Sequence, residues 1–100
     1  MSEKKEKEVK LEIQVDEDVA QGIYANLAVV NHSDAEFTLD FIFVQPQAPR
    51  AKVRSRVITS PKHLKRLMLA LQDNVQKYGQ RFGPIDVGSP EDVPQPGGYH

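Results

Sequence analysis

The stretch from Ser60 to Gly83 constrains the fold of this chain more than any other part of the sequence. Its apolar residues recur at steps of three and four, the spacing that lines one face of an α-helix of about 22 residues. Ser60 can cap the first turn, and Pro61 suits the first helical position, where its missing N–H costs nothing. Gly83, followed by Pro84, ends the helix. Such a helix needs a surface to lie on. The apolar positions are Leu64, Leu67, Met68, Leu71, Val75, Tyr78 and Phe82.

Four runs before this helix predict the strands that supply the surface. Residues 9–15 alternate between apolar and polar side chains, as in a half-buried strand. Residues 23–31, 36–45 and 51–59 are rich in β-branched and aromatic residues and are separated by turn residues or prolines. The prediction is an α+β fold, in which an antiparallel four-stranded β-sheet is followed by one long C-terminal α-helix packed on one face. The face expected to hold the helix carries Phe37, Leu39, Phe41 and Phe43.

The sequence predicts a single domain with an extension at each end. Residues 1–8 read as a disordered charged arm, residues 9–83 as one β-β-β-β-α domain, and residues 84–100 as a flexible tail rich in proline and glycine. A core of about 75 residues buries only about 60% of its unfolded surface. The chain has no cysteine, and its three histidines lack metal-ligand spacing, so no disulfide, metal or cofactor is expected. Self-association remains as the means of stabilisation.

Self-association is expected through the sheet face opposite the helix. Grouping the second and third strands by their two-residue period leaves an apolar patch on that face, of the size that usually marks an interface. A dimer is the commonest arrangement, and a tetramer of two dimers comes next. No apolar run exceeds about eight residues, so a soluble cytoplasmic protein without membrane contact is expected. The predicted interface residues are Tyr24, Ala28, Val30, Ile42 and Val44, with Leu69 adding a second contact from the helix.

Charge divides the sequence into two blocks. From Leu11 to Asp40 there are seven acids and no base, and from Phe41 to Gln72 there are seven bases and no acid. One interpretation is that the two blocks neutralise each other across the sheet or across a subunit interface. The other is that the basic block binds phosphates of a nucleic acid, although no aromatic residue alternates with its strand cations. The candidate anion-binding or partner-binding residues are Arg50, Lys52, Arg54, Arg56, Lys62, Lys65 and Arg66.

The sequence favours a function without catalysis. His32, Ser33 and Asp34 are the residue types of a hydrolase triad, but contiguous residues cannot point into one relay, so they read as a turn. A phosphate-binding loop, a dinucleotide fingerprint and paired catalytic acids do not occur in the sequence. No enzymatic activity is predicted.

Five runs of the sequence are distinctive: YAN at 24–26, EFTLDF at 36–41, SRVITSPKHLKRL at 55–67, ALQDNVQKY at 70–78 and FG at 82–83. Together they resemble one family of small prokaryotic proteins, the domain of unknown function 3467. The likeness covers residues 9–85, and the family carries no assigned activity. Its order of four strands and a long helix looks like the export chaperone SecB, which implies a homo-oligomer whose apolar surface binds unfolded or partner polypeptide. This chain lacks the second long helix of SecB.

Two functions follow as hypotheses. The first is a non-enzymatic homo-oligomeric protein-interaction module with chaperone-like polypeptide binding. The alternative is a nucleic-acid-binding module that uses the basic surface of the fourth predicted strand and the helix.

Overall fold

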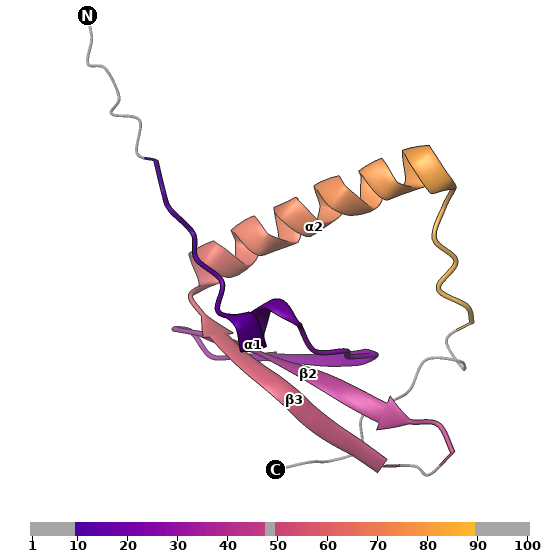
Figure 1. The fold of residues 1–100 in the computed structure, drawn as a ribbon, viewed down its shortest axis with the longest axis horizontal. Coiled ribbons are helices and arrows are strands. Elements are labelled where there is room, and N and C mark those ends of the chain that lie inside the picture. The colour runs from indigo at the N-terminus through magenta and orange to yellow at the C-terminus, as the bar shows by residue number, and fades with distance from the viewer. Residues whose placement is uncertain (1–9, 48–49, 90–100) are drawn as a thin grey trace, which may run out of the picture.

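The computed structural model describes residues 10–47 and 50–89. An antiparallel sheet in the order β1-β2-β3 is followed by one long helix (Figure 1). The α+β class, the antiparallel sheet and the long C-terminal helix are confirmed, and the last two strands and the helix begin and end within one residue of their predicted bounds. The elements are α1 (Glu17–Ala20), β1 (Leu27–His32), β2 (Phe37–Gln45), β3 (Arg50–Thr59) and α2 (Pro61–Phe82).

The predicted strand over residues 9–15 is not a strand in its described part, residues 10–15. Leu11 and Ile13 are 77% and 81% exposed, so the alternating pattern buries little against the described residues. The segment leads instead into α1, a single turn in which the amide of Ala20 donates to the carbonyl of Asp16 at 2.8 Å. The described sheet therefore has three strands rather than four, because an alternating pattern shows which face a strand would bury but not which edge it would join.

Strand β2 lies in the centre of the sheet, and its pairing with β3 contains a β-bulge. Phe41 pairs with Ser55, whereas the next residue, Ile42, pairs with Val53, so Arg54 is the extra residue of β3. An uninterrupted two-residue period would place Val53, Ser55 and Val57 on one face. The bulge reverses the alternation and moves Val53 to the face opposite the other two, since each extra residue shifts the two-residue period by one. The face that carries Phe37, Leu39, Phe41 and Phe43 is called the Phe face below.

The core of the single chain is small and centres on β2. Among the described residues, Leu39, Asp40 and Ile42 are buried, at 8%, 1% and 4% exposure. The guanidinium of Arg56 donates to both carboxylate oxygens of Asp40, from Nε at 2.7 Å and from Nη2 at 2.9 Å. The expected pairing of a β2 acid with a β3 base is confirmed at this position, where the register places Asp40 opposite Arg56.

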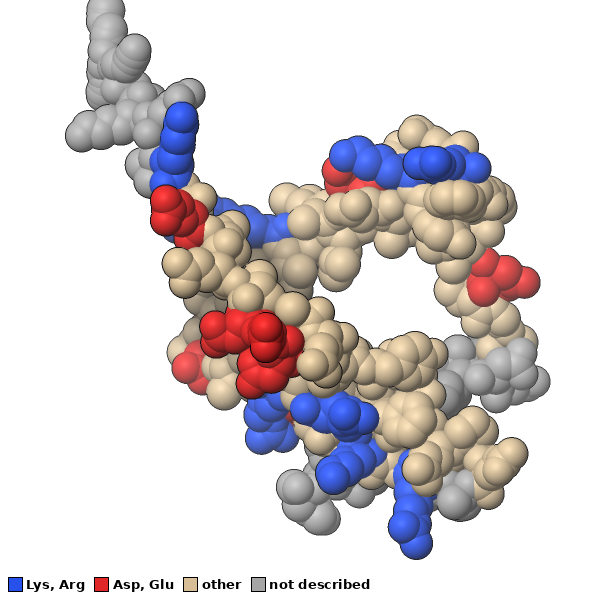
Figure 2. Space-filling model, viewed as in Figure 1, with Lys and Arg blue, Asp and Glu red and all other residues tan. Residues whose placement is uncertain are grey.

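Ser60 is the single residue between β3 and helix α2. The Ser60 hydroxyl accepts a hydrogen bond from the amide of His63 at 3.3 Å, as expected of an N-cap, and Gly83 ends the helix with φ +94°. The expected packing of the helix on the Phe face is not found: none of the α2 residues, all of which are described, is buried. Figure 2 shows an open gap between the helix and the sheet. The radius of gyration is 18.0 Å, against about 13 Å for a compact chain of 100 residues.

Candidate interaction surfaces

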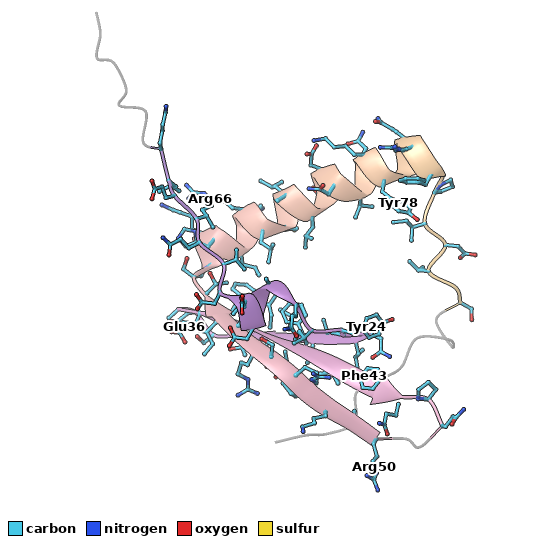
Figure 3. All side chains as sticks on the ribbon, viewed as in Figure 1. Tyr24, Glu36, Phe43, Arg50, Arg66 and Tyr78 are labelled. Carbon is cyan, nitrogen blue, oxygen red and sulfur yellow. The ribbon has the colours of Figure 1, made fainter. Side chains whose placement is uncertain are left out.

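The largest candidate surface is the line of apolar side chains along α2, called the apolar stripe below. It consists of the seven residues that predicted the helix, and its exposed fractions reach 56% at Leu71 and 66% at Phe82. Tyr78 lies on the side of the helix that faces the gap (Figure 3), and its ring centroid is 5.0 Å from that of Phe82. A row of large apolar side chains this exposed is typical of a surface that a partner covers.

The Phe face is the second apolar surface, and strand β1 extends it. Ala28 pairs with Phe41 and Val30 pairs with Leu39, so both join this face. The Tyr24 ring meets the Phe43 ring edge-on, with the centroids 6.1 Å apart. The face is only partly covered, since Val30 and Val57 remain 51% and 44% exposed.

The predicted oligomer interface is divided between two faces of the sheet. Tyr24, Ala28 and Val30 lie with the Phe face, whereas Ile42 and Val44 lie on the opposite side. Placing all five on one face was wrong, because the two-residue period groups residues within a strand and says nothing about how neighbouring strands are aligned. Ile42 belongs to the buried core of the single chain, and Val44 is half-buried. Their contact with a second copy stays a prediction.

Leu69 lies on the other side of α2 from the apolar stripe, since successive helical residues turn by about 100°. It is 51% exposed. A second contact at Leu69 stays a prediction, and it would have to come from a different direction than a partner bound to the stripe.

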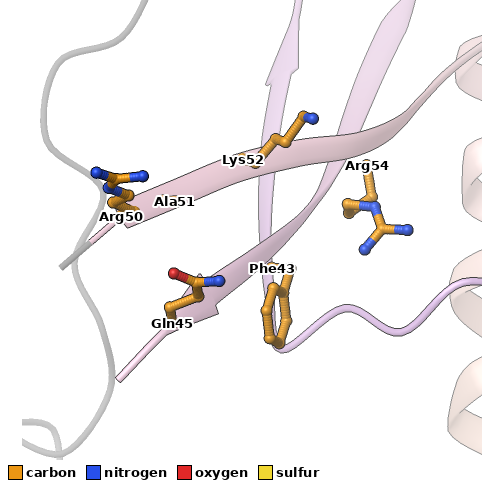
Figure 4. Close-up of a pocket in the computed structure, with 6 residues that line it drawn as sticks. All are labelled: Phe43, Gln45, Arg50, Ala51, Lys52 and Arg54. Atoms are coloured by element: carbon orange, nitrogen blue, oxygen red, sulfur yellow. The ribbon is translucent and has the colours of Figure 1, made fainter. Parts of the chain in front are cut away.

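The seven predicted basic residues separate into three groups. Arg50, Lys52 and Arg54 line a pocket of about 420 Å³ near the start of β3, together with Phe43, Gln45 and Ala51. Figure 4 shows the cations along β3, with Phe43 and Gln45 contributed by β2. No acidic residue is among these six, so the pocket combines three cations with an aromatic ring. The sequence did not indicate the role of Phe43, because its pairing with Lys52 depends on the bulge at Arg54.

The remaining four cations lie elsewhere. Arg56 is held by Asp40 on the opposite side of the sheet from the Phe face. Lys62, Lys65 and Arg66 are exposed at the start of α2, and the first turn of this helix contains no acid. Cations there oppose the helix macrodipole, so an anionic partner would be favourable. The candidate anions are a phosphate and the carboxylates of the Asp16–Asp18 segment in the same or another subunit.

Asn26 has a role that the sequence analysis missed. Its side-chain amide donates to the carbonyl of Val44 at 3.0 Å and its side-chain oxygen accepts from the amide of Val44 at 2.8 Å. The side chain thus pairs with Val44 as a peptide group of a neighbouring strand would, one residue before β1 begins. The backbone amide of Asn26 also donates to the carbonyl of Ile42 at 3.0 Å. Asparagine has the right donor and acceptor for this pairing, but only the register shows its partner.

Two further features are absent from the described residues. No group of three or more His, Cys, Asp or Glu residues within 10–47 and 50–89 is arranged to hold a metal ion. Within the same ranges, no helix has the length and apolar character needed to cross a membrane.

Three comparisons relate the chain to known proteins. No curated protein and no solved structure matches it. A family model described as "Protein of unknown function (DUF3467)" matches residues 1–87. This range contains the sheet, both helices, the apolar stripe and all seven predicted basic residues. The resemblance noted in the sequence is thereby confirmed, and the chain belongs to the DUF3467 family.

Proposed function

We propose that this protein is a non-enzymatic, homo-oligomeric protein-interaction module. The observation that carries the proposal is the exposure of the apolar stripe of α2 from Leu67 to Phe82, in a chain whose Phe face is also half uncovered. Burying six or seven large apolar side chains contributes about 10–20 kcal/mol as an upper bound. In proteins, most of the stability of a helix comes from packing its apolar face, so α2 has to bury this stripe against a partner surface.

A second copy of the chain is the partner that these surfaces fit best. Each copy has one apolar stripe and one incompletely covered Phe face, so two copies can cover each other reciprocally in a closed symmetric dimer. Direct pairing of two α2 helices fits less well, because each carries five cations and one acid and the helices would repel each other. These charges are Lys62, Lys65, Arg66, Lys77, Arg81 and Asp73.

The proposal extends to chaperone-like binding of polypeptide, as in the export chaperone SecB. An unfolded or partner segment rich in apolar residues would use the same stripe and the same face. The support for this step is the surface itself, which is long and apolar and runs along about five turns of helix.

Light scattering on purified protein tests the proposal. The wild type is expected to have at least twice the 11.3 kDa mass of a single chain. Replacing Leu71→Glu puts a charge in the centre of the stripe and should produce monomers, because a buried unpaired charge is strongly unfavourable. The matched control is Ala70→Glu, which adds the same charge away from the stripe and should leave the mass unchanged. A wild type that is a stable monomer would refute the module.

Nucleic-acid binding is the second candidate function, and the pocket at the start of β3 is the observation that favours it. Three cations beside a half-buried aromatic ring are the groups that contact phosphates and stack on bases of single strands. Phe43 supplies the aromatic residue that was missing from the sequence argument, since it pairs with Lys52.

Fluorescence anisotropy with a single-stranded DNA oligonucleotide tests this second function. Binding should weaken steeply as salt rises. Lys52→Gln with Arg54→Gln should lower the affinity and reduce the salt slope by about one for each phosphate that the protein no longer neutralises. Arg56 is left intact, because its removal would disturb Asp40. Arg81→Gln is the control, because it removes one positive charge in the last turn of α2 and leaves the pocket residues unchanged. No binding by the wild type at low salt would exclude the function.

A further inference from the structure

Residues 10–16 form an apolar, alternating segment that has no partner strand among the described residues. Leu11, Ile13 and Val15 are 77%, 81% and 60% exposed, with Lys10, Glu12 and Gln14 between them. Three large apolar side chains at every second position are typical of a strand that covers one side of a sheet. Among the described residues, no strand pairs with this pattern.

Strand β3 offers the edge that such a segment needs. It is an outer strand of the described sheet, and its ten residues pair on one side only, with β2. An open edge carries unpaired backbone N–H and C=O groups that can accept a further strand. Pairing two β3 strands with each other is disfavoured, since each brings four cations: Arg50, Lys52, Arg54 and Arg56.

Charge distinguishes the two open edges of the sheet. The segment and the turn after it carry four acids, Glu12, Asp16, Glu17 and Asp18, against the single base Lys10. β3 is strongly basic, whereas β1 contains no Asp, Glu, Lys or Arg and is only six residues long. Figure 2 shows acidic side chains gathered over α1, with Lys and Arg side chains over the nearby β3 region. The acidic segment therefore matches the edge of β3 and not that of β1.

We propose that residues 10–16 of one copy add a fourth strand to the free edge of β3 in a second copy. The inference rests on the proposed homo-oligomer and names one of its contacts. Exchange between copies satisfies the alternating pattern that the single chain leaves exposed, and it joins the acidic segment to the basic strand. The exchange is reciprocal, so each subunit of a closed dimer acquires a four-stranded sheet.

Disulfide cross-linking between singly substituted chains tests this contact, because the natural chain has no cysteine. One protein carries Ile13→Cys, and its partner carries one cysteine at a position from Val53 to Val57, made as a panel of five variants. A bond between the two proteins is necessarily intermolecular. After mixing and mild oxidation, the mixed disulfide should form several-fold more at one or more of these positions than with Val30→Cys in β1, the control for the other edge.

The outcomes separate this inference from the proposed function. If the wild type is an oligomer but no position in β3 cross-links above the β1 control, the fourth strand in trans is wrong and the module stands. If a chain carrying both cysteines closes the bond within itself, and not between chains, at a concentration where the wild type is an oligomer, the strand is added in cis and the exchange is also wrong. If the wild type is monomeric by light scattering, both proposals fail together.

Discussion

At the scale of single residues, the contact between Asp40 and Arg56 contributes most to defining the sheet. Asp40 is 1% exposed and accepts two hydrogen bonds from one guanidinium, a geometry that arginine provides and lysine cannot. A shift of the β2–β3 register by one residue would place Asp40 and Arg56 on opposite faces of the sheet. The pair therefore favours the observed register, in addition to any stability it contributes.

Replacing Arg56→Gln should lower the free energy of unfolding by about 2 kcal/mol, because two charge-assisted hydrogen bonds to a buried carboxylate are removed. The side chain of Arg56 is 55% exposed, which keeps the cost below that of a fully buried pair. Arg54→Gln, at the bulge, is the matched control and should change stability by less than about 0.5 kcal/mol. Urea denaturation measures both. Equal effects of the two substitutions would mean that net charge, and not the contact with Asp40, is responsible.

At the scale of elements, helix α2 could be predicted closely because its limits are local. A capping serine, a proline at the first position and a glycine stop lie within the sequence that they delimit, and the structure confirms Pro61–Phe82. The bounds of β2 and β3 were predicted almost as closely, from the composition of the strands and the turn residues between them. The Arg54 bulge, the pairing of Asn26 with Val44 and the division of the predicted interface could not be predicted, because each depends on alignment between strands.

The packing of α2 and the predicted first strand were misjudged for a related reason. Both patterns correctly mark surfaces that need a partner, but a pattern does not say whether the partner lies in the same chain. In the single chain, Leu11 and Leu71 are 77% and 56% exposed. The apolar stripe and the alternating segment are thus the same kind of signal, and the proposed assembly would account for both.

Gly79 provides a prediction at the scale of the helix. It lies inside α2, next to the apolar stripe, and a Cβ added there would meet nothing within 4 Å in the single chain. Since alanine favours a helix over glycine by about 1 kcal/mol, Gly79→Ala should raise the stability of an isolated chain by roughly that amount. Thermal unfolding followed by circular dichroism measures the change.

Gly79→Ala also tests whether a partner packs against this part of the helix. If a partner element packs closely against Gly79, the added methyl group will weaken association, and light scattering will show more monomer than in the wild type. Gln76→Ala is a suitable control, because it changes an exposed residue one turn earlier without adding volume beside the stripe. Association that is unchanged in Gly79→Ala would place the partner away from this part of the helix.

At the scale of the whole molecule, the described chain is far from compact. Its extents are 62 × 35 × 34 Å, and three buried residues form its core. Small domains with so little buried surface usually need reinforcement by a disulfide, a metal or a partner. The chain has no cysteine, and the described residues contain no cluster that could hold a metal. A partner subunit is the reinforcement that the exposed surfaces favour.

This reasoning predicts that assembly and helix content change together. On dilution, an oligomer dissociates by mass action, and α2 then loses the packing that stabilises it. The helical circular dichroism signal should therefore fall over the same concentration range in which light scattering shows the mass falling to 11.3 kDa. Leu71→Glu should show the reduced helical signal at every concentration, whereas Ala70→Glu should follow the wild type. A helical signal that stays constant while the mass falls would mean that α2 is stable alone, and its exposed stripe would then serve a partner other than a second copy.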